Sequence, residues 1–184
     1  MARGRPRTAR SGTCGAYHRV MVLFRVVRDS PHPPAETWRR VTRWERHGGA
    51  VPLTRMVVMT PAPTREGTVF VARTGPAHSR LGRTRPVAAV LRWTGAARLG
   101  FDDPMKVTLW QPPADGAAGL CHLEKLGEVI RGRAEIEVRP SAAGALVVWR
   151  EEARVRALPR FLDPLLAPAC RLVFGRAMDR LLRD

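Results

Sequence analysis

Residues 159–183, PRFLDPLLAPACRLVFGRAMDRLLR, contain the longest helical pattern in the sequence. Apolar residues recur there at spacings of three and four, which predicts one apolar helix face made of Leu162, Leu165, Leu166, Ala169, Leu172, Val173, Ala177 and Leu181. Pro164 fits in the first turn of a helix, whereas Pro168 is expected to kink the helix or delay its start. A helix of about 25 residues is roughly 35 Å long, enough to cross a curved sheet.

Short segments rich in valine, leucine and phenylalanine precede this helix and predict strands. They cover residues 18–29, 53–60, 68–74, 105–111, 119–130, 133–139 and 145–157. Asp102-Asp103-Pro104 is interpreted as a turn before the fourth of them. Arg131-Gly132 and residues 141–144 are breaks short enough for hairpins, so the last three strands predict an antiparallel meander.

A helix is also expected after the first strand, because prolines 31, 33 and 34 end that strand and suit a first helical turn. Trp38, Val41 and Trp44 are three residues apart and therefore share one face. Gly48-Gly49 is expected to end the segment. The pattern allows either one short helix or a broken pair.

One long helix on the concave face of an antiparallel sheet is an α+β arrangement. Short motifs follow each other in order along the chain, and they are PPAETW at 33–38, VTRW at 41–44, GT at 67–68, GFDDPM at 100–105 and VWREE at 148–152. In this order the chain resembles the START-like, or SRPBCC, superfamily and its polyketide cyclase/dehydrase-like members. The resemblance implies a helix-grip fold, in which a curved sheet of about six or seven strands wraps around the C-terminal helix. It also implies a cavity for a lipid, sterol, polyketide or other hydrophobic molecule, and in some members aromatic ring closure.

The length of 184 residues suits one domain, expected over residues 18–184. Residues 1–17 are predicted to be a disordered basic tail, or upstream translation before a start at Met21. Residues 75–100 interrupt the meander and are predicted to be an insertion, either a lid or an unstructured segment. Lysine and arginine number 32 against 16 acidic residues, which gives a net charge of +16. This excess is open to two interpretations, a basic surface from GC-rich codons or binding of nucleic acid.

Three widely spaced cysteines exclude a disulfide framework and a zinc ribbon or finger, and they fit a reducing compartment. No segment approaches the ~20 apolar residues of a membrane span, so a cytoplasmic protein is expected. Nucleophile-elbow, phosphate-loop and dinucleotide motifs are absent from the sequence, and no cofactor is predicted.

Four residues are candidates for ligand binding: Phe101, Trp149, Glu151 and Arg73. In residues 147–157 the arginines share one parity, which points Trp149 and Glu151 inward. A carboxylate on an apolar face can act as a general acid or base. The alternative is a structural role, in which Glu151 pairs with an arginine or lies at a hydrated strand end. Arg73 would neutralise an anionic ligand if its side of the strand faced the cavity.

Other polar residues are expected to have structural roles. Glu135 and Glu137 are predicted to pair with arginines across strands, and Cys121 and Cys170 are predicted to be packing residues. His122 shares a strand face with Glu124 without a third ligand in sequence, so no metal site is expected.

Three functional hypotheses follow, and the first is a protein that binds a hydrophobic or amphipathic small molecule. The second is an enzyme of the cyclase or dehydratase type with Glu151 as acid or base. The third is a nucleic-acid binder that uses the tail and the 75–100 insertion. Because lysines, arginines and aromatic residues are not interleaved, nucleic acid is the least favoured partner. The sequence does not predict an oligomeric state.

Overall fold

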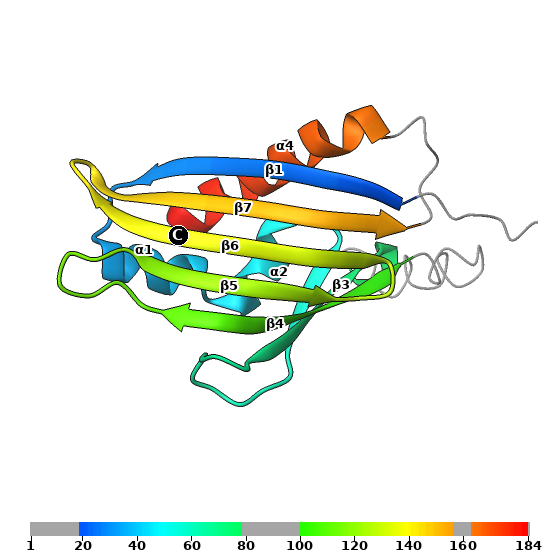
Figure 1. The fold of residues 1–184 in the computed structure, drawn as a ribbon, viewed down its shortest axis with the longest axis horizontal. Helices are drawn as coiled ribbons and strands as arrows, with labels where there is room; N and C mark the ends of the chain where they lie inside the picture. Colours follow the sequence, from blue (N-terminus) through cyan, green and yellow to red (C-terminus); the bar gives the residue numbers. More distant parts are fainter. Residues whose placement is uncertain (1–18, 79–99, 157–162, 184) are drawn as a thin grey trace, which may run out of the picture.

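A seven-stranded antiparallel sheet forms one layer of the molecule, and helices cover one face of it (Figure 1). The computed structural model describes residues 19–78, 100–156 and 163–183. Within them the strand order is β1-β7-β6-β5-β4-β3-β2. The strands are β1 Arg19–Ser30, β2 Thr54–Val58, β3 Val69–Thr74, β4 Phe101–Gln111, β5 Gly119–Leu126, β6 Ile130–Ser141 and β7 Gly144–Arg156. The helices are α1 Pro34–Val41, α2 Trp44–Ala50, the short 3-10 helix η1 Pro76–His78 and α4 Asp163–Arg183.

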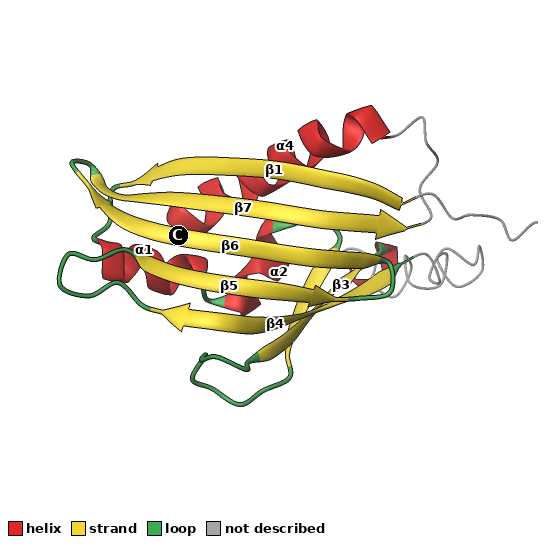
Figure 2. Cartoon of the chain, viewed as in Figure 1, coloured by secondary structure: helices red, strands yellow, loops and turns green. Residues whose placement is uncertain are grey.

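The helices α1, α2 and α4 lie on the same side of the sheet, behind the strands in Figure 2. α4 packs against β1, α1 and α2 and runs obliquely across the sheet. The order of elements and this one-sided cover confirm the predicted α+β helix-grip architecture.

The alternation along the strands decides which side chains reach the core. In β6, Ala134, Ile136 and Val138 are buried, as their parity predicts. In β7, Val147 and Trp149 are buried on the same face of the sheet. The core therefore lies between this concave face and the helices.

The segment after β1 is a broken pair of helices, one of the two predicted forms. Trp38, Val41 and Trp44 are all buried on the face toward the sheet. The predicted end at Gly48-Gly49 was wrong, because α2 continues to Ala50. A Cβ atom at Gly48 would lie 2.9 Å from the backbone nitrogen of Met56 in β2, so this glycine permits close packing of helix on strand.

The interpretation of Asp102-Asp103-Pro104 as a turn was also wrong, because these residues belong to β4. They pair with Arg73, Ala72 and Val71 of β3. The pairing of β4 with β5 starts only at Met105, so at Pro104 the β5 side of the strand has no ladder partner. A proline without an N–H is tolerated at such a position.

The predicted break at Arg131-Gly132 lies inside β6, and the chain turns earlier, between Leu126 and Ile130. Gly132 has a φ of 153°, and a Cβ atom there would lie 2.0 Å from the carbonyl oxygen of Glu152. The glycine is needed because β7 approaches closely at this point, which the sequence pattern did not distinguish from a turn.

The apolar face predicted for α4 was partly wrong. Leu165 and Leu172 are 60% and 53% exposed, and the half-buried residues that pack on the core are Leu166, Ala167, Cys170 and Phe174. Apolar residues occur on several sides of the first half of this helix, so their spacing alone did not select the buried face. In the second half Ala177, Met178, Leu181 and Leu182 are buried. Pro168 lies inside the helix and does not delay its start.

Several predictions fall outside the described residues. These are the tail at 1–17, residues 79–99 of the proposed insertion, residue 157 of the predicted last strand and residues 159–162 of the predicted C-terminal helix. Among the helices that the structure does describe, none is long and apolar enough to span a membrane.

Candidate functional site

The apolar concave face carries three buried charged side chains. They are Asp103 of β4, Lys125 of β5 and Glu151 of β7, which are 5%, 6% and 7% exposed. Each stands at an inward position of its strand, next to core residues such as Leu123 and Trp149 in the same alternation. A lysine, an aspartate and a glutamate are rarely this deeply buried unless they are paired.

The lysine connects the two carboxylates. Lys125 Nζ donates a hydrogen bond to Asp103 Oδ2 at 2.8 Å and lies 3.2 Å from Glu151 Oε1. Trp149 Nε1 donates to the other oxygen of Glu151, Oε2, at 3.2 Å. We call Asp103, Lys125, Trp149 and Glu151 the Lys125 cluster.

The register of the strands makes this arrangement possible. Lys125 pairs with Met105 on one side and with Gly132 of β6 on the other. Glu151 lies opposite Ala134 of β6, so the side chains of Lys125 and Glu151 meet across that strand. The β6 residues opposite Lys125 and Glu151 are therefore both small, Gly132 and Ala134.

The electrostatics keep the lysine charged. Burial by itself would lower the pKa of the Lys125 ammonium, but the charges of Glu151 and Asp103 and their hydrogen bonds raise it above its ordinary value. Lys125 is therefore a permanent cation at physiological pH and does not act as a neutral amine nucleophile or base. Its chemical role is to hold two carboxylates together in a site of low polarity.

On the core side, rings from α2 and α4 lie close to Trp149 of this cluster. The ring of Trp149 lies 5.3 Å from that of Phe174 in α4 and 5.7 Å from that of His47 in α2. Cys170 of α4 is half-buried, and burial together with the charge of Glu151 raises the pKa of its thiol, while Lys125 acts in the opposite direction. Cys170 therefore lies within electrostatic range of the cluster and stays protonated.

The candidate ligand residues occupy different places. Trp149 and Glu151 lie together in the cluster. Phe101, half-buried, is the first residue of β4 and has the same parity as Asp103. Arg73 follows buried Ala72 and therefore points to the outer face, where its Nε atom lies 3.5 Å from Asp102 Oδ2. The structure thus separates Arg73 from the other three.

Sequence reasoning missed Asp103 and Lys125. Lys125 shares the parity of Cys121 and Leu123, so its inward position was readable from the alternation in β5. The inward position of Asp103 was missed because Asp102-Asp103-Pro104 is typical of a turn and was not predicted to be part of a strand. The signal for a buried ion pair was therefore a lysine in the apolar alternation of β5, together with an inward glutamate in β7.

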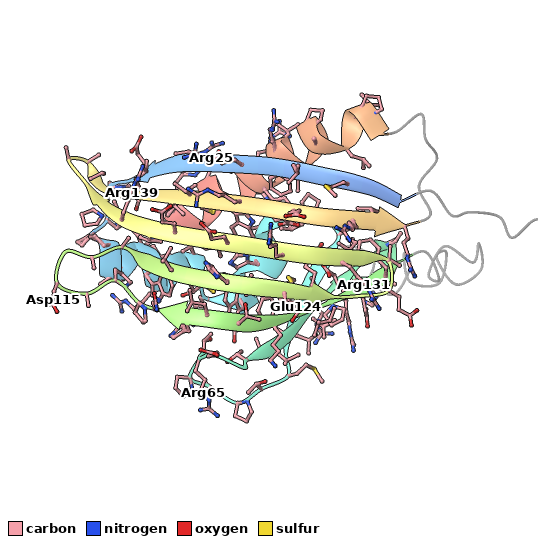
Figure 3. The ribbon with its side chains drawn as sticks, viewed as in Figure 1. Arg25, Arg65, Asp115, Glu124, Arg131 and Arg139 are labelled. Carbon is pink, nitrogen blue, oxygen red and sulfur yellow. The ribbon has the colours of Figure 1, made fainter. Side chains whose placement is uncertain are left out.

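The outer face of the sheet is charged. It forms an open hollow of about 980 Å³ whose arginines are Arg25, Arg131, Arg133, Arg150, Arg154 and Arg171. Figure 3 shows Arg25, Glu124 and Arg131 from this side. Glu135 and Glu137 both pair with Arg150, which confirms the predicted pairing with arginine across strands.

The two polar groups proposed to share a strand face, His122 and Glu124, also lie on the outer face. His122 Nε2 is 3.8 Å from a carboxylate oxygen of Glu135. Among the described residues no three histidine, cysteine or acidic side chains are grouped as a metal site would require. On the core side, Cys121 is buried as predicted, and burial raises the pKa of its thiol to about 12.

Comparison with known proteins identifies the fold of the chain. No protein-family model matches the sequence, and no curated protein matches it. Solved structures do match, among them the Zhui aromatase/cyclase from Streptomyces sp. R1128, with a TM-score of 0.55 and 8% identity over 90% of this chain and 95% of that one. Protein CV1439 from Chromobacterium violaceum matches with a TM-score of 0.54 and 12% identity over 89% and 95%. The chain has the START-like helix-grip fold.

A further structure with this START-like fold is that of Ara h 8.0201, with a TM-score of 0.52 and 11% identity over 89% of this chain and 99% of that one. The matches cover nearly all of each compared structure, so the similarity extends over the whole helix-grip architecture. At these sequence identities the structural similarity establishes the fold, and the function has to be argued from the residues of the site.

Proposed function

We propose that the protein binds a hydrophobic or amphipathic small molecule between the concave face of the sheet and α4. The apolar part of the molecule packs against half-buried Leu166, Cys170 and Phe174 of the helix. Its polar end lies at the Lys125 cluster, beside Trp149 and Glu151. Small-molecule sites are usually lined by apolar side chains together with a few polar groups that orient the ligand.

The observation that carries this proposal is the burial of Asp103, Lys125 and Glu151 on an otherwise apolar face. Buried ion pairs add little stability, because desolvation of the charges offsets their attraction. Apolar side chains of similar size would pack this face at least as well. Charged groups in such a place are therefore functional candidates, and the resemblance found in the sequence implies a ligand cavity on this side of the sheet.

The proposal is tested by filling the proposed space from the helix side. Replacing Cys170 with tryptophan adds a large ring beside Glu151, whereas Leu172→Trp adds the same ring at a side chain that is 53% exposed on the same helix. Native mass spectrometry of freshly purified protein identifies co-purifying small molecules, and displacement of the neutral fluorophore N-phenyl-1-naphthylamine measures affinity. We expect Cys170→Trp to weaken fluorophore binding at least about tenfold, while Leu172→Trp leaves it unchanged.

Equal binding by both variants would place the molecule elsewhere, for example in the outer hollow lined by Arg150 and Arg154. Circular dichroism checks that both variants are folded. Absence of any bound molecule and of fluorophore binding would contradict the proposal altogether.

A second candidate function is a cyclase or dehydratase reaction with Glu151 as the acid–base group. It is favoured by the placement of this carboxylate, held by Lys125 and Trp149 beside apolar surface. The solved aromatase/cyclase with the same fold adds support. Once a substrate is found, Glu151→Gln should reduce turnover, and Glu152→Gln, an adjacent glutamate paired with Arg133 on the outer face, is the control. Full activity of Glu151→Gln would remove the assignment.

We also propose a cytoplasmic location. Cys121 and Cys170 are free thiols, and the three cysteines of the chain are widely spaced, as in proteins of reducing compartments. Fractionation of cells that express the tagged protein tests this location, and recovery from the membrane or the medium would contradict it.

A further inference from the structure

The Lys125 cluster has more hydrogen-bond acceptors than donors. Lys125 supplies three N–H donors and Trp149 supplies one, whereas the carboxylates of Asp103 and Glu151 offer about eight lone-pair positions. One of the lysine donors has only the sulfur of Met105 nearby, with Nζ 3.7 Å from Sδ. The cluster therefore lacks partners for its oxygens more than for its nitrogens.

The shortage of hydrogen-bond donors is greatest at Asp103. Its Oδ2 accepts from Lys125, but Oδ1 is buried and has no hydrogen-bond partner among the described residues. Asp103 is 5% exposed, so bulk water does not readily replace the missing partner. A buried acceptor left unpaired destabilises the folded protein, and a ligand group that donates a hydrogen bond to it removes this cost.

The formal charge of the cluster points the same way. Two carboxylates and one ammonium leave one negative charge that no described side chain of the cluster neutralises. A ligand carboxylate would add a second negative charge where the low local polarity strengthens repulsion. A ligand ammonium would remove the excess charge, and a hydroxyl group would leave it unchanged while donating a hydrogen bond.

We propose that the ligand presents a hydrogen-bond donor, an ammonium or a hydroxyl group, to Asp103 Oδ1, and that the site discriminates against carboxylate ligands. This inference rests on the proposed function, since it specifies the polar end of the molecule bound there. It assigns Asp103 as the residue that decides which headgroup is accepted.

The overall charge of the protein makes the preference easy to recognise. The chain carries a net charge of +16, which attracts anions to its surface at long range. Non-specific binding would therefore favour a carboxylate over an ammonium. A preference for the ammonium can only arise from a local site with the opposite charge.

The test uses three competitors with one chain length, namely dodecylamine, dodecan-1-ol and dodecanoate, below their aggregation concentrations at about pH 7.5. Each displaces N-phenyl-1-naphthylamine, which is uncharged and does not bias the comparison. We expect dodecylamine to displace the fluorophore at a concentration at least about tenfold lower than dodecanoate, with dodecan-1-ol between them.

Two variants locate the preference. Asp103→Asn removes the negative charge and should reduce the preference for amine over carboxylate at least about tenfold. Glu124→Gln changes the net charge by the same amount at an exposed position on the outer face of β5 and should keep the preference. If Asp103→Asn does not fold by circular dichroism, Glu151→Gln removes the other carboxylate and serves in its place.

The outcomes separate this inference from the proposed function. If the fluorophore does not bind, the proposed function fails, and this inference fails with it. If the fluorophore binds but dodecanoate displaces it as well as dodecylamine does, only the headgroup assignment is overturned. If the amine is preferred equally by the protein and by Asp103→Asn, the discriminating residue is not Asp103.

Discussion

Lys125 is one of two lysines in a chain with 32 basic residues, and the other is Lys106. The pair offers a natural comparison, because Lys125 is buried between two carboxylates whereas Lys106 is exposed on β4. The first explains how two acidic groups remain on an apolar face. Lys106 has no comparable ion pair with any residue that the structure describes.

Replacing Lys125 with methionine should lower the free energy of unfolding by about 3–5 kcal/mol, because it leaves Asp103 and Glu151 buried without a counter-charge. Lys106→Met should change it by less than about 0.5 kcal/mol. Urea unfolding followed by tryptophan fluorescence measures both. A deficit of Lys125→Met as small as that of Lys106→Met would contradict this explanation.

His47 predicts a further pH dependence of stability. Burial lowers its pKa to about 4, against the opposing effects of the hydrogen bond to the Val41 carbonyl and the charge of Glu45. The unfolded chain therefore binds a proton between about pH 6.5 and 4 that the folded protein does not bind. Stability is retained above this range and is lost as the pH falls through it.

From about pH 7 to pH 5 the loss from His47 should be about 2 kcal/mol. His47→Gln keeps a donor for the Val41 carbonyl, which accepts from Nε2 at 2.8 Å, and removes the titration. Chemical unfolding at the two pH values should show a smaller loss in this variant. The same loss in both proteins would assign the pH dependence to other groups.

At the scale of elements, β6 is the strand that links the cluster to the rest of the sheet. It lies between β5 and β7, and at Gly132 its backbone closely approaches Glu152 of β7. A Cβ atom here would meet backbone atoms of Glu152 and Ala153. The pairing of β6 with β7, the strand that carries Glu151, therefore depends on this glycine.

Gly132→Ala should destabilise the protein by more than about 3 kcal/mol, because its Cβ would lie 2.0 Å from a carbonyl oxygen. Gly116→Ala is the matched control, since Gly116 also has a positive φ, 78°, but no atom within 4 Å of an added Cβ. Its cost should be about 1 kcal/mol from backbone strain alone. Thermal unfolding of the two variants measures the difference, and similar losses would show that contact with β7 is unimportant.

An element could be predicted from the sequence where residues close together in the chain determine it. The inward residues of β6 and β7 were predictable because alternation alone decides them, and this placed Trp149 and Glu151 on the concave face. The membership of Asp103 in β4 was not predictable, because a pairing with β3 overrides the local preference of Asp-Asp-Pro for a turn. The partner of Glu151 required the register of three strands, which the sequence does not state.

At the scale of the whole molecule, charge and shape are divided between two faces. Arginines line the outer hollow of the sheet, and the concave face holds the apolar core and the Lys125 cluster beneath the helices. The excess of basic residues therefore does not describe the site where a ligand is proposed to bind. In the described part of the chain, the positive residues form a shell around an apolar interior with one negatively charged cluster.

The central claim, that a small molecule binds beside this cluster, is tested most directly by nuclear magnetic resonance of the tryptophan indoles. Trp149 donates its Nε1–H to Glu151 in the cluster, whereas Trp110 packs against Trp38 of α1, with ring centroids 4.9 Å apart. Substitution of each tryptophan by phenylalanine assigns the two resonances. On titration with dodecylamine we predict that the Trp149 indole resonance shifts and saturates while that of Trp110 stays in place. A Trp149 resonance that does not move under saturating dodecylamine would contradict the account.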